Sequence, residues 1–291
     1  MRQPRLGVAI LTMGNRPREL DALLESVAAQ HTPAARIVVV ANGAPLPLLP
    51  DGVTGVILAE NEGVAGGRNA ALARLREFGD VDVVVDLDDD GLLISKDDFC
   101  RVAELFEQDR RLGIVSFRIA DERGRTQRRH VPRLRASDPL RGGYVTTFLG
   151  GGHALSTAML DETGGWPDEF FYAHEETDLA WRALDARWRV LYAPELVLQH
   201  PWTSPTRHAV YHRMVARNRV WLAKRHLPAV LVPLYLGVWT ALTLARTRSR
   251  AGLRAWFGGF AEGVRMPCGR RKPMRWRTVW RMTRLGRPPV I

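Results

Sequence analysis

Short apolar strands alternate with amphipathic helices over the first 120 residues, and this alternation restricts the fold more than any other feature of the chain. A strand is expected at residues 6–11, and Leu20, Leu23, Leu24 and Val27 recur at helical spacing within 18–30. Further strands are expected at 36–40, 53–58, 81–85 and 113–119, and further helices at 67–78 and 98–108. Strands of this buried type between helices predict an α/β fold with a mostly parallel, doubly wound sheet.

An acidic run, residues 86–90, follows the fourth expected strand, at the sheet edge where ligands of such folds bind. Four carboxylates in five residues repel one another, and a cation would offset that repulsion. On a strand, Asp88 and Asp90 point to the same side and could share one Mg²⁺ or Mn²⁺ ion, which prefer oxygen ligands. The alternative is a solvated acidic turn, or a cluster capping the helix that follows Lys96. The apolar strand before the run favours the metal site.

A glycine-rich segment at residues 61–69 precedes the next expected helix. Its glycines let the backbone approach a ligand closely, and a helix start presents free N–H groups to an anion. The guanidinium of Arg68 could donate two parallel hydrogen bonds to phosphate oxygens. Because glycines before a helix are common in α/β proteins, this segment alone is weak evidence for a phosphate site.

Two further candidates lie in the second half of the chain. Glu175, Glu176 and Asp178 open an expected helix, where the helix dipole and capping favour acidic residues without any function. The functional alternative is a general base that deprotonates an acceptor hydroxyl. His200 follows two short, edge-like strands expected at 189–192 and 196–199. A lone histidine is usually structural, but near an oxygen-rich site it becomes a candidate third metal ligand.

The basic residues are concentrated near the C-terminus. From position 207 onward the chain holds 19 of its 42 Lys and Arg residues but one of its 31 acidic residues, so this tail carries +18 and the rest carries −7. Residues 227–245 are uncharged and just long enough to span a bilayer. Residues 254–287 mix Trp and Phe with arginines, a composition that suits a membrane interface. We prefer interfacial membrane association; helices packed on the catalytic domain and a true span are the alternatives.

A polar, arginine-rich stretch at residues 121–141 is expected to be a mobile loop. It could clamp an anionic acceptor such as a lipid-linked diphosphate sugar, or it could be a solvated surface loop. Its arginines, with one from the preceding strand, are Arg118, Arg123, Arg125, Arg128, Arg129, Arg133, Arg135 and Arg141.

Taken together, these motifs resemble the family 2 glycosyltransferases with the GT-A fold, over about residues 5–205. Residues 8–12 followed by Asn15-Arg16-Pro17 are similar to the first strand and helix of that family, and residues 61–69 to its donor segment. Asp88-Asp89-Asp90 resembles its DxD motif. Residues 164–171 and 175–179 resemble its acceptor segment, with Glu175 and Glu176 on the acidic pair that carries the base.

The resemblance implies inverting transfer of a hexosyl or deoxyhexosyl group from a nucleotide-diphosphate sugar, with Mn²⁺ or Mg²⁺ as cofactor. It implies a GT-A type doubly wound mixed sheet flanked by helices. The catalytic domain is expected over 1–205, with a donor half at about 1–120 and an acceptor half at about 142–205, followed by a basic, partly apolar helical tail over 206–291. Glu176 is the expected base and Glu175 its alternate, and Asp88, Asp90 and His200 are the expected metal ligands. Expected donor-binding residues are Thr12, Asn15, Arg16, Asn42, Asn61, Gly63, Arg68, Asn69, Asp88 and Asp89, and expected acceptor-binding residues are Gly151, Gly152, Trp166 and Asp178.

One departure from the family pattern bears on the donor. The second strand is followed by Ala41-Asn42-Gly43 and lacks the aspartate that the family often carries there, which leaves the nucleotide undetermined. The expected acceptor is a glycan or lipid-linked molecule at the cytoplasmic face of the plasma membrane, with an anionic membrane surface as partner. Two cysteines, Cys100 and Cys268, suit free thiols in a reducing compartment, and we expect no signal peptide.

Two rival functions compete with sugar transfer. A nucleotidyltransferase would use similar carboxylates, but it usually shows a glycine-rich, basic N-terminal signature. Residues 11–18 contain a single glycine, Gly14. A nucleic-acid-binding protein would use the basic tail, but the tail contains no recognition motif. We therefore expect no nucleic-acid partner.

Overall fold

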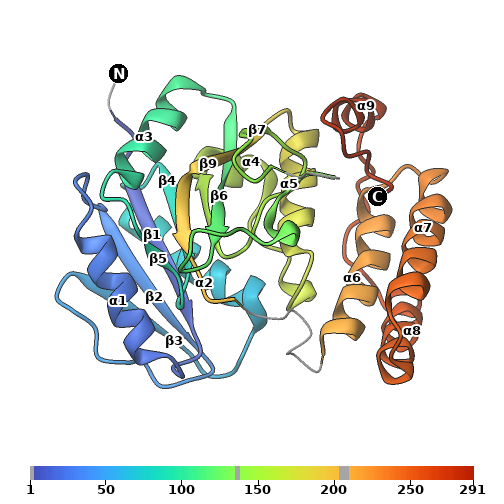
Figure 1. Cartoon of the computed structure of the whole chain (residues 1–291), viewed down its shortest axis with the longest axis horizontal. Helices are drawn as coiled ribbons and strands as arrows, with labels where there is room; N and C mark the ends of the chain where they lie inside the picture. Colours follow the sequence, from blue (N-terminus) through green and yellow to red (C-terminus); the bar gives the residue numbers. More distant parts are fainter. Residues whose placement is uncertain (1–2, 135–137, 203–209) are drawn as a thin grey trace.

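The computed structural model describes residues 3–134, 138–202 and 210–291, and it is built around one mixed β-sheet with helices on both faces (Figure 1). The strand order is β3-β2-β1-β4-β8-β6-β9-β5, with β7 paired to β9. Pairs β1–β2, β2–β3, β1–β4 and β6–β9 are parallel, and the pairs of β8, β5 and β7 with their neighbours are antiparallel. The doubly wound mixed sheet predicted from the sequence is confirmed. The strands are β1 Leu6–Thr12, β2 Arg36–Asn42, β3 Val53–Leu58, β4 Val83–Asp88, β5 Leu92–Leu93, β6 Leu112–Ala120, β7 Gly143–Tyr144, β8 Gly152–Ser156 and β9 Arg189–Gln199.

Alternating strand residues feed two separate hydrophobic cores, as the two-residue repeat of a strand requires. On β1, Val8 and Ile10 pack on one face with α1 and α3, whereas Ala9 packs on the other face with α2, α4 and α5. Both faces of the central strands are therefore buried, which explains their continuous apolar sequence. The helices are α1 Pro17–Ala28, α2 Gly63–Phe78, α3 Asp98–Gln108, α4 Thr157–Thr163, α5 Glu175–Asp185, α6 Tyr211–His226, α7 Leu231–Arg246, α8 Arg250–Arg265 and α9 Trp276–Arg284, with short 3-10 turns at Arg128–His130 and Asp168–Phe170.

Three local predictions need correction. Helix α2 begins at Gly63, four residues before the expected start, so most of the glycine-rich segment forms its first turns. The two edge-like strands expected near His200 are one continuous strand, β9, which lies inside the sheet between β6 and β5. Strand β8 and helix α4 were not expected, although β8 lies between β4 and β6 at the centre of the sheet.

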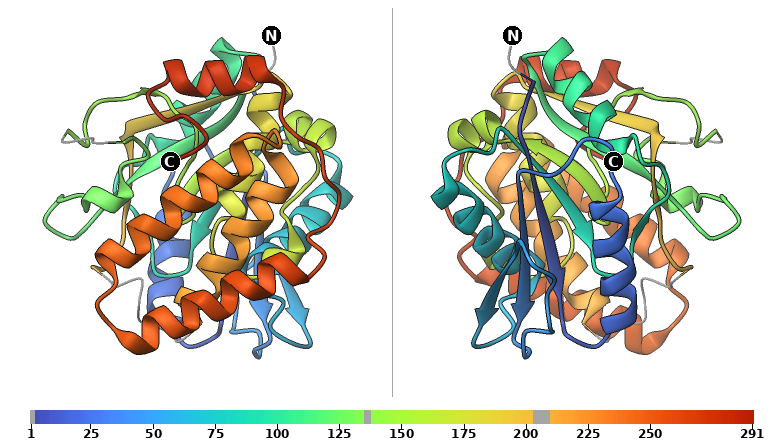
Figure 2. Two further views of the ribbon diagram at one scale, coloured as in Figure 1. Left: turned by 90° about the vertical axis from the view of Figure 1, so that its right-hand side faces the viewer. Right: turned by 90° about the vertical axis from the view of Figure 1, so that its left-hand side faces the viewer.

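The C-terminal helices pack on the catalytic part of the chain through α6, α7 and α9, and Thr278 of α9 donates to Asp185 of α5 at 2.6 Å. His226 of α6 bonds to Asp178 of α5 with a nitrogen–oxygen distance of 2.6 Å, and Trp181 of α5 contacts Tyr235 of α7 edge to face. Helices α7 and α8 lie outermost, in front of α6 when the molecule is seen from that side (Figure 2). Helices packed on the catalytic domain were one alternative for the tail, and α6 packs in this way, as do the inner faces of α7 and α9. Of the helices described, α7 included, none is sufficiently long and apolar to cross a bilayer.

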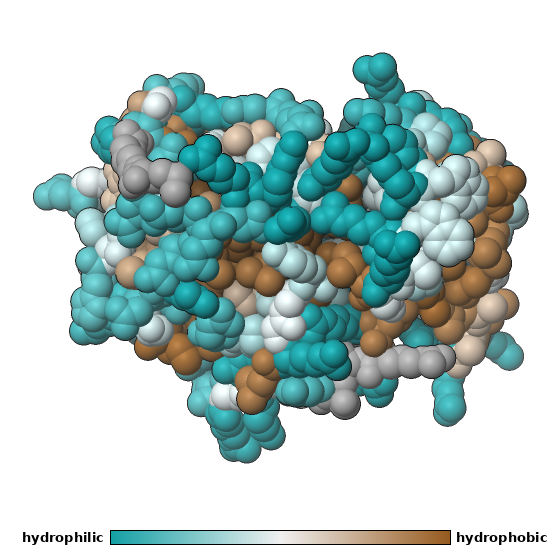
Figure 3. Space-filling model, turned by 90° about the horizontal axis from the view of Figure 1, so that it is seen from above, coloured by the Kyte–Doolittle hydropathy of each residue, from teal (hydrophilic) through white to brown (hydrophobic). Residues whose placement is uncertain are grey.

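The outer side of the C-terminal helices is apolar. Seen from above, hydrophobic side chains gather at this end of the molecule, whereas the rest of that surface is mostly hydrophilic (Figure 3). Exposed side chains on or next to α7 include Val230, Leu234 and Leu244, and Trp276 and Trp280 of α9 are more than half exposed. Because α9 buries Thr278, Val279 and Met282 and α7 buries Tyr235, the inner layer of the tail consists of α6 and the buried faces of these two helices, and the outer layer of their exposed faces.

Candidate active site

A cleft of about 520 Å³ lies at the carboxyl ends of β1, β2 and β4. The first turn of α2 forms part of its wall. Strands β1 and β4 are parallel neighbours, so their ends bring residues 12–16 against residues 88–90. The cleft is lined by nine of the predicted donor-binding and metal-binding residues, Asn15, Arg16, Asn42, Asn61, Gly63, Asp88, Asp89, Asp90 and His200. It is the ligand position that the topology of the sheet predicts.

Asp88, Asp90 and His200 converge in this cleft. One carboxylate oxygen from each aspartate and one imidazole nitrogen lie within 4.8 Å of one another. Asp88 ends β4, Asp90 lies in the turn that follows, and His200 comes directly after β9, so the sheet itself brings the three together. Two carboxylates and one imidazole form a donor set that suits Mn²⁺ or Mg²⁺ with further positions open to a ligand. The residues fit the metal site predicted from the sequence.

The orientation of His200 strengthens this fit. Its Nδ1 lies 2.8 Å from the carbonyl oxygen of Pro201, and its Nε2 lies 3.0 Å from Asp90 Oδ1. When Nδ1–H donates to that carbonyl, the Nε2 lone pair is left to face the two aspartates, which is the arrangement of a metal-ligating histidine. Burial acts to lower the pKa of His200, but the hydrogen bond to Asp90 and the charges of both aspartates raise it above its ordinary value.

Thr12 and Arg16 hold the middle aspartate of the run, Asp89. Thr12 Oγ1 donates to Asp89 Oδ2 at 2.7 Å, and Arg16 Nη1 donates to Asp89 Oδ1 at 3.1 Å and also pairs with Asp90. Thr12 is buried and does not line the cleft, so its predicted contact with the donor is corrected to a contact with Asp89. Asp89 is itself largely buried, and it anchors the turn that presents its two neighbours.

Arg68 lies beneath the cleft. Its guanidinium donates to Asp86 Oδ1 at 3.1 Å and to the carbonyl of Gly150 at 2.6 Å, and it covers the ring of Trp166. Burial acts to lower the pKa of Arg68, but the charges of Asp86, Asp88 and the two nearby glutamates raise it, so the group stays a cation. The Arg68 side chain is 3% exposed and does not line the cleft, so it does not present its guanidinium to a phosphate group there. It stabilises the carboxylates from below instead.

Glu175 and Glu176 begin α5 and face the same arginine. Glu176 Oε1 lies 4.0 Å from Arg68 Nη1, which is buried without a hydrogen-bond partner, and the Glu176 side chain is 21% exposed. Glu175 is 3% exposed, and its Oε2 is buried without a partner. Burial raises the pKa of both carboxyl groups, and for Glu175 the neighbouring Glu176 raises it further. Glu176 is therefore the member of the pair that a ligand can reach.

Asparagine side chains shape the turns around the cleft. Asn42 donates to Asn61 Oδ1 and to the carbonyl of Gly63, and its Oδ1 accepts from the Glu62 N–H. Gly63 has φ +76°, and a Cβ there would collide with the carbonyl oxygen of Phe171, so only glycine fits. Asn69 lies outside the cleft lining and joins α2 to Trp166 through two backbone hydrogen bonds, which corrects its predicted donor contact.

The loop before Glu175 is held from the C-terminal helices. Phe171, Ala173 and His174 all have positive φ, a strained conformation for residues other than glycine. Asn218 of α6 donates through Nδ2 to the carbonyls of Phe170, Tyr172 and Ala173 at 2.7–2.9 Å. These bonds, which sequence reasoning missed because the partners are about 45 residues apart, fix the approach to the two glutamates.

The family becomes clear from comparison with known proteins. The model for the family described as "Glycosyl transferase family 2" matches residues 8–163, which is more than half of the chain. The chain belongs to this family. A search of curated protein sequences found no match to this glycosyltransferase.

Solved structures with the same fold are glycosyltransferases as well. GalNAc-T7, solved with UDP, GalNAc and Mn²⁺, is 13% identical at a TM-score of 0.63; the alignment covers 90% of this chain and 54% of that one, so the chain spans about half its length. TarS 1–349 from S. aureus is 17% identical with a TM-score of 0.59, covering 90% and 81%. The mannosyltransferase PcManGT from Pyrobaculum calidifontis, solved with GDP-Man and Mn²⁺, is 19% identical with a TM-score of 0.57, covering 98% and 85%. These likenesses establish the GT-A fold.

The predicted acceptor residues of this glycosyltransferase have mixed positions. A Cβ at Gly151 would lie 3.2 Å from Asp88 Oδ2, which places Gly151 beside the metal-binding group, and Gly152 begins the buried strand β8. Trp166 is 4% exposed and packs under Arg68, so it supports the site from below. Asp178 is 1% exposed, with its carboxylate bound to Arg182, Arg225 and His226. Its predicted acceptor contact is therefore corrected to a buried ion-pair network.

The arginine-rich loop contributes to the cleft at one point. Arg129 and His130 line it, together with Phe171 and Tyr172, and of these four the sequence singled out Arg129 alone. Arg118 of β6 donates to the carbonyls of Pro194 in β9 and of Gly124, and Arg125 donates to Asp121. Arg133 donates to the carbonyls of Arg141 and Gly142. Arg135 lies outside the described residues. Hydrogen bonds thus join the described part of this stretch to itself and to β9; its mobility stays a prediction.

Proposed function

We propose that this glycosyltransferase moves a hexosyl or deoxyhexosyl group from a nucleotide-diphosphate donor to an acceptor hydroxyl with inversion. The observation that carries the proposal is the position of the Asp88, Asp90 and His200 group, which shares one cleft with the asparagine turns and borders the Arg68–Glu176 pair. GalNAc-T7 and PcManGT were solved with a nucleotide or a nucleotide sugar together with Mn²⁺. Membership of the family favours sugar transfer over the nucleotidyltransferase and nucleic-acid alternatives.

Asp88, Asp90 and His200 would hold Mn²⁺ or Mg²⁺ at the donor diphosphate. The bound cation neutralises charge on the departing diphosphate. Arg16 and Thr12 keep the acidic turn in place through Asp89, and Arg68 offsets the repulsion among the carboxylates. The cleft of about 520 Å³ is within the range of small-molecule sites, and its asparagine and glycine turns leave the backbone accessible to a nucleoside.

Glu176 is the proposed general base. It takes the proton of the acceptor hydroxyl while that oxygen forms its bond to the anomeric carbon and the bond from that carbon to the diphosphate oxygen breaks. This single displacement inverts the anomeric centre and needs no nucleophile from the protein. Burial favours the role because it raises the pKa of Glu176, which makes the carboxylate a stronger base.

We propose further that the acceptor is a glycan or lipid-linked molecule in cell-envelope assembly, and that the enzyme docks on the anionic cytoplasmic face of the plasma membrane. The outer layer of the tail supports this choice of surface. Trp276 and Trp280 are exposed on α9 beside Arg277 and Arg284, and α7 exposes an uncharged face. Aromatic and apolar groups among arginines suit the headgroup region of an anionic bilayer.

The test is a binding screen by calorimetry and thermal shift, with UDP, dTDP and GDP, each with Mn²⁺, Mg²⁺ or EDTA. We expect one nucleotide to bind in a metal-dependent manner to the wild type and to Asp97→Ala, because Asp97 is an exposed acid outside the cleft. Asp90→Ala should lose this binding. Absence of any nucleotide binding, or equal binding by Asp90→Ala, would contradict the proposed donor site.

A further inference from the structure

Arg16 lies where the acidic run meets the open cleft. It immediately precedes α1, and its side chain lines the cleft and is 29% exposed. Its Nη1 donates to Asp89 Oδ1 at 3.1 Å and also pairs with Asp90 Oδ2. One nitrogen of this guanidinium group therefore holds two neighbouring aspartates, and one of them, Asp90, belongs to the metal-binding group.

The two aspartates have different surroundings. Asp89 is largely buried, its Oδ2 accepts from Thr12 at 2.7 Å, and it lies outside the metal-binding group. Asp90 is in that group, and its Oδ1 lies 3.0 Å from His200 Nε2. A cation ligated by Asp90 would therefore compete with Arg16 for this carboxylate, whereas the contact between Arg16 and Asp89 could persist.

Charge decides the outcome of this competition. The Asp90 side chain is largely buried, and charges in such places are screened less by water and salt than charges at the surface. A divalent cation attracts the carboxylate more strongly than the single charge of a guanidinium group does, and it repels that group. The pair between Arg16 and Asp90 is therefore expected to break when Asp90 ligates a cation.

The Arg16 side chain also has hydrogen-bond donors to spare. A guanidinium group carries five N–H donors in a planar fork that matches the oxygens of a phosphate group. Nη1 of Arg16 is taken up by the two aspartates, whereas Nε and Nη2 form no hydrogen bond with the described part of the chain. These donors suit an anion that enters the cleft.

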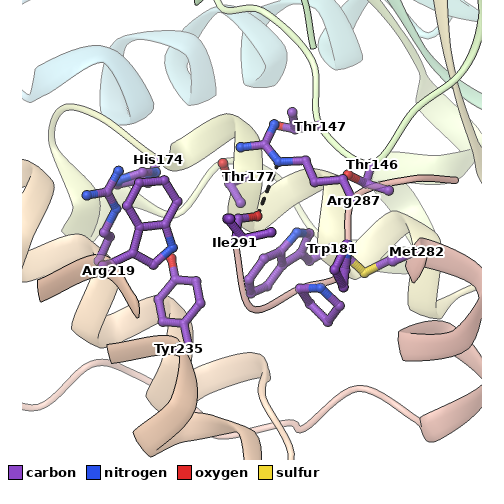
Figure 4. A pocket seen from close by; sticks show the side chains of 13 residues that line it. Thr146, Thr147, His174, Thr177, Trp181, Arg219, Tyr235, Met282, Arg287 and Ile291 are labelled. Carbon is purple, nitrogen blue, oxygen red and sulfur yellow. Dashed lines mark hydrogen bonds between the residues drawn. The ribbon is translucent and has the colours of Figure 1, made fainter. Parts of the chain in front are cut away.

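Other arginines near the two glutamates do not line the cleft. Arg68 is buried beneath it. Figure 4 shows a separate, smaller cavity beside α5 and α6 that is lined by two more arginines, Arg219 and Arg287. Arg287 donates to the main-chain oxygen of Ile291 at 3.4 Å. Of these four arginines, Arg16 is the one that could reach a ligand in the cleft.

We propose that Arg16 changes partners when Asp90 ligates the cation: it leaves Asp90, stays bound to Asp89, and donates to the diphosphate of the sugar donor. One side chain would thereby couple binding of the cation to binding of the donor, because the phosphate-binding donors are released at the metal site. The contact with the donor rests on the proposed function, whereas the competition between Arg16 and the cation for Asp90 does not.

The test measures two affinities of the full chain. The first is the affinity for Mn²⁺ without nucleotide, followed by the electron paramagnetic resonance signal of free Mn²⁺. Arg16→Gln should bind Mn²⁺ about three- to tenfold more tightly than the wild type, because Asp90 no longer pairs with a guanidinium group. The second is the affinity for UDP, dTDP and GDP at saturating Mn²⁺. The nucleotide that binds the wild type should bind Arg16→Gln about tenfold more weakly, the loss expected for a charge-assisted hydrogen bond.

Two further variants separate this role from simpler ones. Arg18→Gln removes the same charge from an exposed residue of α1 outside the cleft, and both affinities should stay within about twofold of the wild type. Arg16→Lys keeps the charge but lacks the fork, so it should bind Mn²⁺ like the wild type and the nucleotide more weakly. This variant tests the proposal if Arg16→Gln does not fold. A residue that only held the acidic turn in place would instead lower both affinities when replaced.

Several results would overturn the proposal. These are a wild type that does not bind Mn²⁺, an Arg16→Gln variant that binds Mn²⁺ no more tightly than the wild type, and equal nucleotide binding by both. Equal changes in Arg16→Gln and Arg18→Gln would assign the effect to overall charge and also overturn it. Tighter Mn²⁺ binding by Arg16→Gln without nucleotide binding by any variant would leave the competition for Asp90 standing while the proposed function fails, so the two failures are distinguishable.

Discussion

The cleft and the C-terminal helices carry opposite charges. Around the cleft, the six carboxylates from Asp86 to Asp90 and from Glu175 to Glu176 share two arginines, Arg16 and Arg68. The tail has the reverse composition, with 19 basic residues to one acid from position 207 onward. Each region therefore holds more charge of one sign than its own side chains offset. The difference agrees with a cation in the cleft and with the proposed anionic partner at the tail.

The largest expected effect concerns the acidic groups around the cleft. Glu176→Gln keeps the size of the side chain but removes the base, so sugar transfer should fall by about 100- to 10,000-fold. Nucleotide binding should persist, because Glu176 does not line the cleft. The measurement is the transfer rate with the donor found in the nucleotide screen. Glu175→Gln is the matched comparison; a larger loss in that variant would make Glu175 the base.

The contact between the two regions can be broken at Asp178. Asp178→Asn would leave Arg225, Arg182 and His226 without their carboxylate, and we expect the free energy of unfolding to fall by about 3–5 kcal/mol. Denaturant unfolding monitored by circular dichroism measures the change. Asp161→Asn breaks an exposed pair with Arg76 and should lower stability by less than about 1 kcal/mol. Equal losses in both variants would contradict a special role for the buried network.

The same aspartate makes stability depend on pH. Burial acts to raise the pKa of Asp178, but His226, Arg182 and Arg225 lower it well below the ordinary 3.8. Because the folded-state pKa is lowered, the stabilisation is present above pH 3.8 and is lost as the pH falls below it. Unfolding curves recorded from about pH 5 to about pH 2.5 should therefore show a steeper loss in the wild type than in Asp178→Asn. Parallel curves would show that the pair contributes nothing.

The smallest effect concerns the outer layer of the tail. Replacing Trp276 and Trp280 with serine should weaken binding to vesicles of anionic phospholipid by about three- to tenfold, because two apolar side chains no longer enter the interface. Raising the salt concentration should weaken binding further, since the arginines act through charge. Co-sedimentation measures both. Trp202→Ser removes an exposed tryptophan of the catalytic part and should change nothing.

Sequence reasoning predicted those parts of the molecule that are encoded locally. The strand at 53–58 and the helix at 98–108 match the structure to the residue, because apolar periodicity and flanking turns determine them. The metal-binding group was also predicted, since Asp88, Asp90 and His200 each lie at the end of a strand or just after it. Strand β8 was missed because its five residues follow a run of glycines that reads as a loop.

Side-chain partners were harder to predict than side-chain types. Arg68 and Asn69 were predicted to contact the donor, whereas in the structure Arg68 bonds to Asp86 and Asn69 bonds to the backbone of Trp166. Asp178 lies in the first turn of a helix, as acidic residues often do, but two of its three partners, Arg225 and His226, lie 47 and 48 residues later on α6. Such pairings depend on how helices dock, which no local pattern records.

Asn218 has a consequence for how such an enzyme could be taken apart. Its three hydrogen bonds hold the strained loop that leads into Glu175, although it belongs to the tail. A chain that ended near residue 206 would keep the cleft residues from Leu11 to His200. It would lose Asn218, and with it the hydrogen bonds that position the base. Exchange of tails between relatives would encounter the same obstacle. We therefore expect the catalytic part to need its own tail in order to position the base.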